Sequence, residues 1–189
     1  MPPLSPDRTG ERRQRILEAA RHLVLRLGFR GTTMEAIARE AAIAKPTLYA
    51  QFPDKDAIYA AIVDGLADDL QKALDQGLNV EGAVADRVGA ALAGQFGALA
   101  AALEGSPHAA ELMSEHKRAG AKFREKDAHA QARIRAELQE AGIVDAEDLA
   151  GILMAAAYGI ALKTTERTSM EARVRLLCRR MINGALGDQ

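Results

Sequence analysis

Residues 31–55 read GTTMEAIAREAAIAKPTLYAQFPDK. The spacing of their apolar residues predicts a short helix over residues 34 to about 41 and another over residues 45 to about 52. Only residues 42–44 separate the two helices, which is the length of the turn in a helix-turn-helix motif. Two helices this short cannot enclose a core by themselves, so a further helix must pack across them.

The ends of these two helices carry recognisable signals. Thr32 or Thr33 can cap the first helix with its hydroxyl oxygen. Pro46 lies in the first turn of the second helix, where a missing N–H costs nothing. Two positions suit the motif less well, because Ala42 must take the turn conformation without the freedom of glycine and Ala44 offers no capping oxygen.

The second helix combines an apolar edge with a polar face. Leu48 and Phe52, at positions i and i+4, face inward. The hydrogen-bonding side chains left outside are Lys45, Thr47, Tyr49 and Gln51. A helix in the DNA major groove needs short polar side chains for base edges and longer ones for phosphates. The pattern therefore indicates a recognition helix.

The flanking sequence predicts a wholly helical chain. Residues 1–10 hold three prolines and no periodicity, so we expect a flexible arm there. An apolar stripe then predicts the helix that packs across the motif, ending at Gly28 as its C′ residue. Asp54 can cap a long helix that Gly77 and Asn79 break. Further helices are expected over residues 80–103, 108–117, 121–141, 145–164 and 170–186, about nine in all.

Composition and charge agree with this prediction. Hydrophobic residues make up 48% of the 189, mostly Ala and Leu, with 4% aromatic, which favours an all-α fold. Residues 1–55 hold ten Lys or Arg and six Asp or Glu, a net charge of +4, whereas the remainder carries −5. A basic head on an acidic body suggests that the head meets a polyanion. Without a signal sequence, a membrane span or paired cysteines, we expect a cytoplasmic protein.

Several short motifs occur in order over about residues 12–65. They are Ile37-Ala38 in the first short helix, KPTLY at 45–49 and FPDKD at 52–56. In these residues the chain resembles the TetR family of bacterial transcription regulators. The resemblance implies a DNA-binding head over residues 11–55 and a ligand-binding and dimerisation body over residues 56–189. It also implies a homodimer, built from residues 145–164 and 170–186, on an inverted-repeat DNA operator.

The resemblance further implies two roles for residues of the head. Residues 45–47 read base edges. Thr33, Tyr49, Gln51 and Lys55 contact phosphates, and the positive end of its helix assists Thr33. Judged on side-chain chemistry alone, Thr33 is equally well explained as a cap and Tyr49 as half-buried packing. The candidate DNA contacts are Thr33, Lys45, Pro46, Thr47, Tyr49, Gln51 and Lys55.

The body offers candidates for a ligand cavity, although the same residues suit an ordinary core. The candidates are Phe96, Leu99, Met113, His116, Phe123, Met154 and Tyr158. Such a lining favours a small, mostly apolar effector oriented by Tyr158 or His116.

We expect no metal site and no cofactor. His108 and His116 stand eight residues apart, not at the i, i+4 spacing that places two ligands on one helix face, although Glu111 and Glu115 lie between them. Cys178 lies in an apolar helix and suits a small buried hydrophobe better than a redox sensor.

The leading hypothesis is therefore a ligand-responsive repressor. An activator, or a regulator that senses no small molecule, is the alternative within the same class. An all-helical enzyme is the alternative from a different class. The sequence contains no Gly-rich phosphate loop, nucleophile elbow or His-Glu-x-x-His motif, so we do not expect an enzyme.

Overall fold

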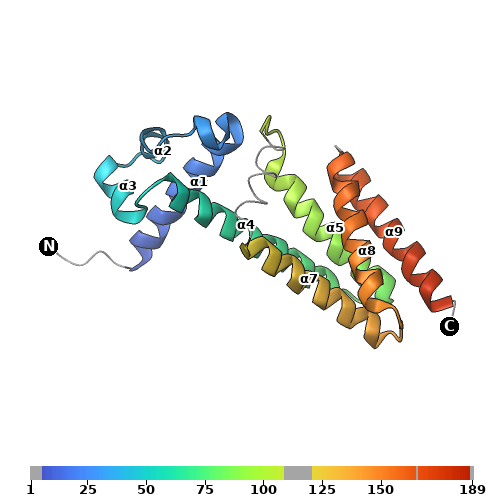
Figure 1. The fold of residues 1–189 in the computed structure, drawn as a ribbon. Coiled ribbons are helices and arrows are strands. Elements are labelled where there is room, and N and C mark those ends of the chain that lie inside the picture. Colours follow the sequence, from blue (N-terminus) through green and yellow to red (C-terminus); the bar gives the residue numbers. More distant parts are fainter. Residues whose placement is uncertain (1–5, 109–120, 165, 188–189) are drawn as a thin grey trace. The chain divides into compact units, whose positions relative to one another are not determined.

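The computed structural model describes residues 6–108, 121–164 and 166–187, and every regular element in these ranges is an α-helix (Figure 1). This confirms the all-α prediction. The helix expected over residues 108–117 lies, except for its first residue, outside the described residues. The helices are α1 (Pro6–Gly31), α2 (Met34–Glu40), α3 (Lys45–Gln51), α4 (Lys55–Leu78), α5 (Val84–Leu103), α7 (Ala121–Glu140), α8 (Ala146–Lys163) and α9 (Arg167–Gly187).

The chain divides into two compact units. The first comprises residues 1–65 and 103–120, and the second comprises residues 66–102 and 121–189. The functional boundaries expected after residues 10 and 55 stay predictions.

The core of the first unit joins helices α1, α2, α3 and the start of α4. Ile16 of α1, Ile37 of α2, Leu48 of α3 and Ile58 of α4 are each at most 1% exposed, and Phe52 closes the cluster. The apolar stripe of the first helix does pack across the two short helices, as the sequence predicts. This helix begins at Pro6, so residues 6–10, which the sequence places in a flexible arm, are helical.

Helix α1 is interrupted at Gly28, where φ is 74° and ψ is 166°. This backbone conformation has a positive φ, which glycine adopts without steric cost. The chain is helical again after Gly28 and remains so to Gly31. Leu27, the residue before Gly28, is 42% exposed.

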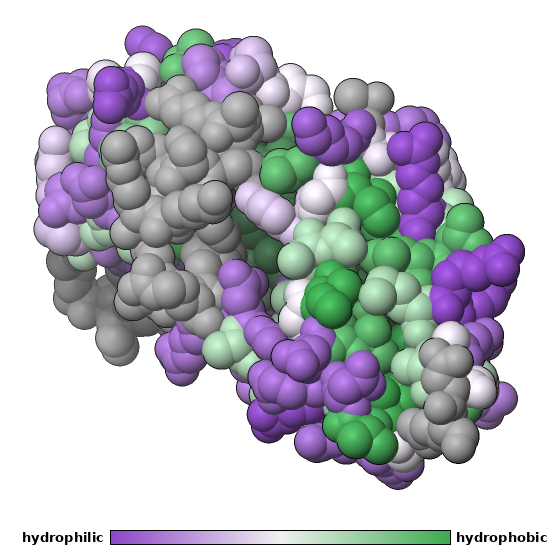
Figure 2. Space-filling model, turned by 45° about the vertical axis from the view of Figure 1, so that its right-hand side comes forward, coloured by the Kyte–Doolittle hydropathy of each residue, from purple (hydrophilic) through white to green (hydrophobic). Residues whose placement is uncertain are grey.

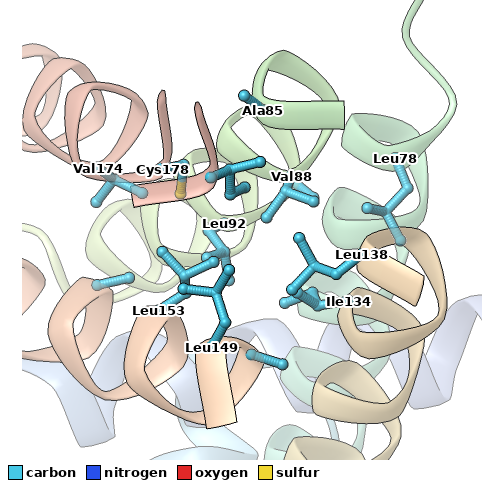
Figure 3. Packing of buried hydrophobic residues seen from close by; sticks show 14 of the residues in the cluster. Leu78, Ala85, Val88, Leu92, Ile134, Leu138, Leu149, Leu153, Val174 and Cys178 are labelled. Atoms are coloured by element: carbon cyan, nitrogen blue, oxygen red, sulfur yellow. The ribbon is translucent and has the colours of Figure 1, made fainter. Parts of the chain in front are cut away.

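The second unit is a helical bundle with its own core. The last part of α4 packs with α5, α7, α8 and α9, and Figure 3 shows the side chains that meet between them. The largest contributors include Leu74, Leu92, Ile134, Leu138, Leu153, Met170 and Ile182.

The long helix α4 ends at Leu78, between the two predicted breakers Gly77 and Asn79, although Gly77 itself is still helical. A Cβ at Gly77 would stand 2.3 Å from the backbone N and Cα of Ala91 in α5. The glycine therefore allows two helix backbones to pack closely.

Candidate nucleic-acid interface

Two adjacent threonines form different hydrogen bonds at the start of α2. The Oγ1 of Thr33 accepts a hydrogen bond from the Ala36 N–H at 3.2 Å, which makes Thr33 the N-cap. Thr32 is 1% exposed, and its hydroxyl donates to the Gly28 carbonyl at 2.9 Å. Thr33 remains exposed beside the first turn of α2. Its capping bond is thus established, and its phosphate contact stays a prediction.

The turn between α2 and α3 is a Schellman ending built on alanine. The Ile43 N–H donates to the Ala38 carbonyl at 3.0 Å, and the Ala42 N–H donates to the Arg39 carbonyl at 3.1 Å. Ala42 occupies the left-handed position with φ of 52°. The sequence therefore correctly marks Ala42 as a residue that takes a glycine-like conformation.

Helix α3 starts without a side-chain cap, as expected for Ala44. The Ala44 carbonyl still accepts from the N–H groups of Thr47 at 2.9 Å and Leu48 at 3.2 Å. Pro46 occupies the first turn. A proline at this point holds φ near the helical value and loses no intrahelical hydrogen bond.

The predicted outer face of α3 is exposed in the structure. Leu48 is fully buried and Phe52 is 2% exposed, so the two inward residues anchor the helix. Lys45, Pro46 and Tyr49 are exposed, with Tyr49 at 48%, whereas Thr47 and Gln51 are half-buried. About half of the Tyr49 surface is buried, so half-buried packing remains an alternative to its phosphate contact, which stays a prediction. Hydrogen-bonding groups remain on this face.

One acid lies against the candidate base-reading residues. The Lys45 Nζ lies 3.1 Å from an Oε1 of Glu35 on α2, and both side chains are exposed. The hydrogen bond from Lys45 is the main reason that the pKa of Glu35 lies below its usual range. The predicted DNA contact of Lys45 would require the side chain to leave this carboxylate.

Lys55 lies at the start of α4 and is tied to the end of α1. Its Nζ donates to the Phe29 carbonyl at 2.9 Å and lies 4.3 Å from the centre of the Phe29 ring. Phe29 also packs on Tyr59, with ring centroids 4.8 Å apart. Lys55 thus has a structural role that its sequence context does not reveal, because the partner is a backbone carbonyl 26 residues away. Its phosphate contact stays a prediction.

Asp54 caps the start of α4, as the sequence predicts. The Oδ1 of Asp54 accepts from the Ala57 N–H at 2.7 Å. On α1, the Arg13 guanidinium lies 4.2 Å from the centre of the Phe52 ring, another contact that the sequence does not reveal.

The candidate effector residues fall into two sets. Phe96 is buried, its ring lies 6.2 Å from that of Tyr158, and Leu99, Met154 and Tyr158 pack against the second core. Met113 and His116 lie outside the described residues, as does the side chain of Phe123. The structure therefore brings four of the seven candidates to one core.

Other candidates for chemistry give no sign of a reactive site. Among the described residues, no three His, Cys, Asp or Glu side chains are grouped so that they could hold a metal ion. Glu111, Glu115 and His116, considered as metal ligands with His108, lie outside this part of the chain. Cys178 is fully buried, and burial raises the pKa of its thiol to about 11. None of the helices in the described ranges is long and apolar enough to span a membrane.

Comparisons with known proteins agree with this architecture. Residues 16–62 match the model for "Bacterial regulatory proteins, tetR family". A search of curated proteins found no relative with significant sequence similarity.

Among solved structures, a TetR-like transcriptional regulator from Rhodococcus sp. RHA1 is 22% identical with a TM-score of 0.71, over 92% of this chain and 96% of that one. Salmonella enterica GusR is 24% identical with a TM-score of 0.69, over 98% of both chains. The fatty acid degradation regulator FadR from Bacillus halodurans is 15% identical with a TM-score of 0.65, over 93% and 95%. Residues 16–62 are therefore similar to the tetR family of bacterial regulatory proteins, and the whole chain has a fold similar to that of solved TetR-like transcription regulators.

Proposed function

We propose that this protein is a cytoplasmic transcription repressor that binds an inverted-repeat operator as a homodimer and is released by a small, mostly apolar effector. The observation that carries the proposal is helix α3, with its buried Leu48 and Phe52 and its exposed polar face. A helix held rigidly from one side and open on the other can enter a major groove.

The DNA contacts follow from the position of each side chain. Residues 45–47 form the first turn of α3, the part of a recognition helix that contacts base edges. Thr33, Tyr49, Gln51 and Lys55 contact phosphates on either side and set the register. Exposure of Thr33 and Tyr49 leaves their hydroxyl groups available for this purpose.

The homodimer is supported by apolar surface on α8 and α9. Ile152 is 50% exposed, Leu162 is 57% exposed and Leu176 is 53% exposed. Ile152, Ala155, Gly159 and Leu162 follow one another at helical spacing on α8, and all four are exposed. Figure 2 shows a gathered hydrophobic area in the part of the molecule that contains α8 and α9. Small and apolar residues in such a stripe let two helices approach closely, which suits a four-helix dimer interface.

The chemical class of the effector is inferred from the residues of its candidate site. Phe96, Leu99, Met154 and Tyr158 offer apolar and aromatic surface with a single hydroxyl, so they suit a mostly apolar molecule better than a phosphorylated one. Binding would favour a dimer whose recognition helices no longer match successive grooves, with a coupling of about 1–3 kcal/mol.

The DNA roles are tested by operator selection followed by two substitutions in α3. We expect selected sites to be inverted repeats. Thr47→Ala should change the preferred base at one position of each half-site. Tyr49→Phe should weaken binding to all sequences alike, because it removes only a phosphate-bonding hydroxyl. A changed base preference in Tyr49→Phe, or none in Thr47→Ala, would contradict the assignment.

Lys55 needs a separate test because it also bonds Phe29 within the protein. We expect Lys55→Ala to lower the salt dependence of DNA binding by about one unit for each phosphate that a subunit no longer neutralises. The free energy of unfolding is measured on the same variant. A loss of stability with an unchanged salt slope would make Lys55 a purely structural residue.

An activator would bind the same operator, so the two roles are separated by transcription in vitro. Repression predicts that the protein lowers transcript yield from a promoter carrying the selected site and that the effector restores it.

A further inference from the structure

Gln95 places an unpartnered acceptor inside the second core. The side chain is 7% exposed, and its Oε1 is inaccessible to solvent with no hydrogen-bond partner within the described part of the chain. Thr32, the other polar residue buried in the described ranges, does bond, to the Gly28 carbonyl at 2.9 Å. The Nε of Arg135 is also buried without a partner, but that guanidinium bonds Glu147 through its Nη1 at 2.7 Å. Among the described residues, the unpartnered acceptor is that of Gln95.

The position of Gln95 on α5 is that of a core residue. Val88, Leu92, Gln95 and Leu99 are spaced as i, i+4, i+7 and i+11, so they lie along one face of the helix. Val88 and Leu92 are fully buried in the second core (Figure 3), and Leu99 packs against that core. A leucine or methionine at position 95 would continue this stripe, whereas the amide oxygen there loses its hydration without compensation.

The next residue of the same helix belongs to an aromatic pair. Phe96 follows Gln95 directly, and its ring faces Tyr158 of α8 at 6.2 Å between centroids. Tyr158 is half-buried. The neighbourhood therefore combines apolar contact area with one unused acceptor, which is the usual composition of a small-molecule site.

We infer that Gln95 is the residue that orients the effector, by accepting a hydrogen bond from a neutral hydroxyl or amide N–H of a mostly apolar molecule. This inference rests on the proposed effector response. The amide oxygen can only accept, so it selects a ligand that carries a donor. A site built to bond a donor rejects the analogue that lacks it, because the buried acceptor is then left unpaired again.

The first experiment uses the ligand-free, full-length protein. Gln95→Leu and Gln95→Met should raise the melting temperature by about 2–4 °C per kcal/mol gained, because they remove an unpaired buried amide. The matched control is Gln71→Leu on α4, since Gln71 donates to Asp75 at 3.3 Å and should give no such gain. If both Gln95 variants melt below the wild-type protein, the amide has a partner within the protein and the inference is overturned.

The second experiment compares probes that differ only in a donor. The pairs are 4-butylphenol with 4-butylanisole and 1-octanol with its methyl ether, tested by thermal shift and by release of bound DNA. In the wild-type protein the hydroxyl compound of a pair should stabilise more than its ether. In Gln95→Leu this difference should vanish, while Gln71→Leu should keep it.

The outcomes separate the two proposals. Equal stabilisation by alcohol and ether, or an unchanged difference in Gln95→Leu, overturns the role of Gln95 and leaves the effector response standing. If no probe of either kind stabilises the protein or releases DNA, the mostly apolar effector is refuted together with the role of Gln95.

Discussion

Ala42 occupies a backbone conformation that L-amino acids rarely adopt, with φ of 52° in the turn between α2 and α3. The left-handed conformation costs an L-residue about 1–2 kcal/mol relative to glycine, part of which is offset by the greater entropy of glycine in the unfolded chain. The two Schellman hydrogen bonds hold Ala42 in place. The turn conformation that the motif needs therefore lowers the free energy of unfolding when alanine occupies this position instead of glycine.

Replacing Ala42 by glycine should relieve this strain. We expect Ala42→Gly to raise the free energy of unfolding by about 0.5–1 kcal/mol, measured by urea unfolding of the full-length protein. Ala50→Gly in α3 is the control, and it should lower the same quantity by about 1 kcal/mol because Ala50 is helical. A destabilised Ala42→Gly would show that the turn does not strain alanine.

A single carboxylate should limit DNA affinity. Glu35 pairs with Lys45 and adds negative charge beside the recognition helix. We expect Glu35→Gln to tighten operator binding several-fold at low salt, with the gain shrinking as salt screens the charge. Glu81→Gln, in the exposed loop between α4 and α5, removes the same charge outside the motif and should have little effect. An equal gain in both variants would assign the effect to net charge alone.

At the scale of elements, glycines in the same helix have different functions. Gly65 and Gly77 both lie in α4. A Cβ at Gly65 would meet no atom within 4 Å, whereas at Gly77 it would meet the backbone of Ala91 at 2.3 Å. Backbone atoms cannot move aside as the end of a flexible side chain can, so Gly77 determines how closely α4 and α5 pack.

These two glycines form a matched pair for substitution. Gly77→Ala should destabilise the protein by about 1–3 kcal/mol, since the methyl group forces α4 and α5 apart. Gly65→Ala should stabilise it by about 0.5–1 kcal/mol, because alanine is the better helix former and the space is open. Thermal unfolding of both variants measures the contrast, and a neutral Gly77→Ala would disprove the close approach.

At the scale of the whole molecule, the proposed DNA binding requires two heads, because one recognition helix contacts too few bases for a specific site. If the exposed apolar stripe of α8 forms the proposed dimer interface, it affects DNA affinity through dimerisation.

Breaking this stripe should separate the subunits. We expect Ile152→Glu to convert a dimer into monomers at micromolar concentration, because dimerisation would bury the new carboxylate. Affinity for an inverted repeat should then fall by about 100-fold or more, as two linked contacts become one. Light scattering and DNA titration measure the two effects. Val144→Glu is the control, since Val144 is 91% exposed but lies between α7 and α8, and a dimer that persists in Ile152→Glu would refute the interface.

The parts that the sequence determines are those whose physical cause lies within a few residues. The cap at Thr33, the cap at Asp54 and the buried pair Leu48 and Phe52 depend on contacts one helical turn apart. The unusual turn at Ala42 is likewise visible from the spacing of the motif. For this reason the all-α fold and helix α3 with its buried edge could be predicted without coordinates.

Other features depend on which segments meet in three dimensions, and local spacing carries no trace of them. In the sequence Gly77 indicates the end of a helix, and only the structure shows that it lies against the backbone of Ala91. In the sequence Lys55 indicates a phosphate contact, and only the structure shows that its Nζ also donates to the Phe29 carbonyl. Gln95 would pass for a surface amide in the sequence, and only the packed bundle shows that its oxygen lies buried without a partner in the described part of the chain. Close approach and desolvation are properties of neighbouring helices, so the tertiary structure alone decides them.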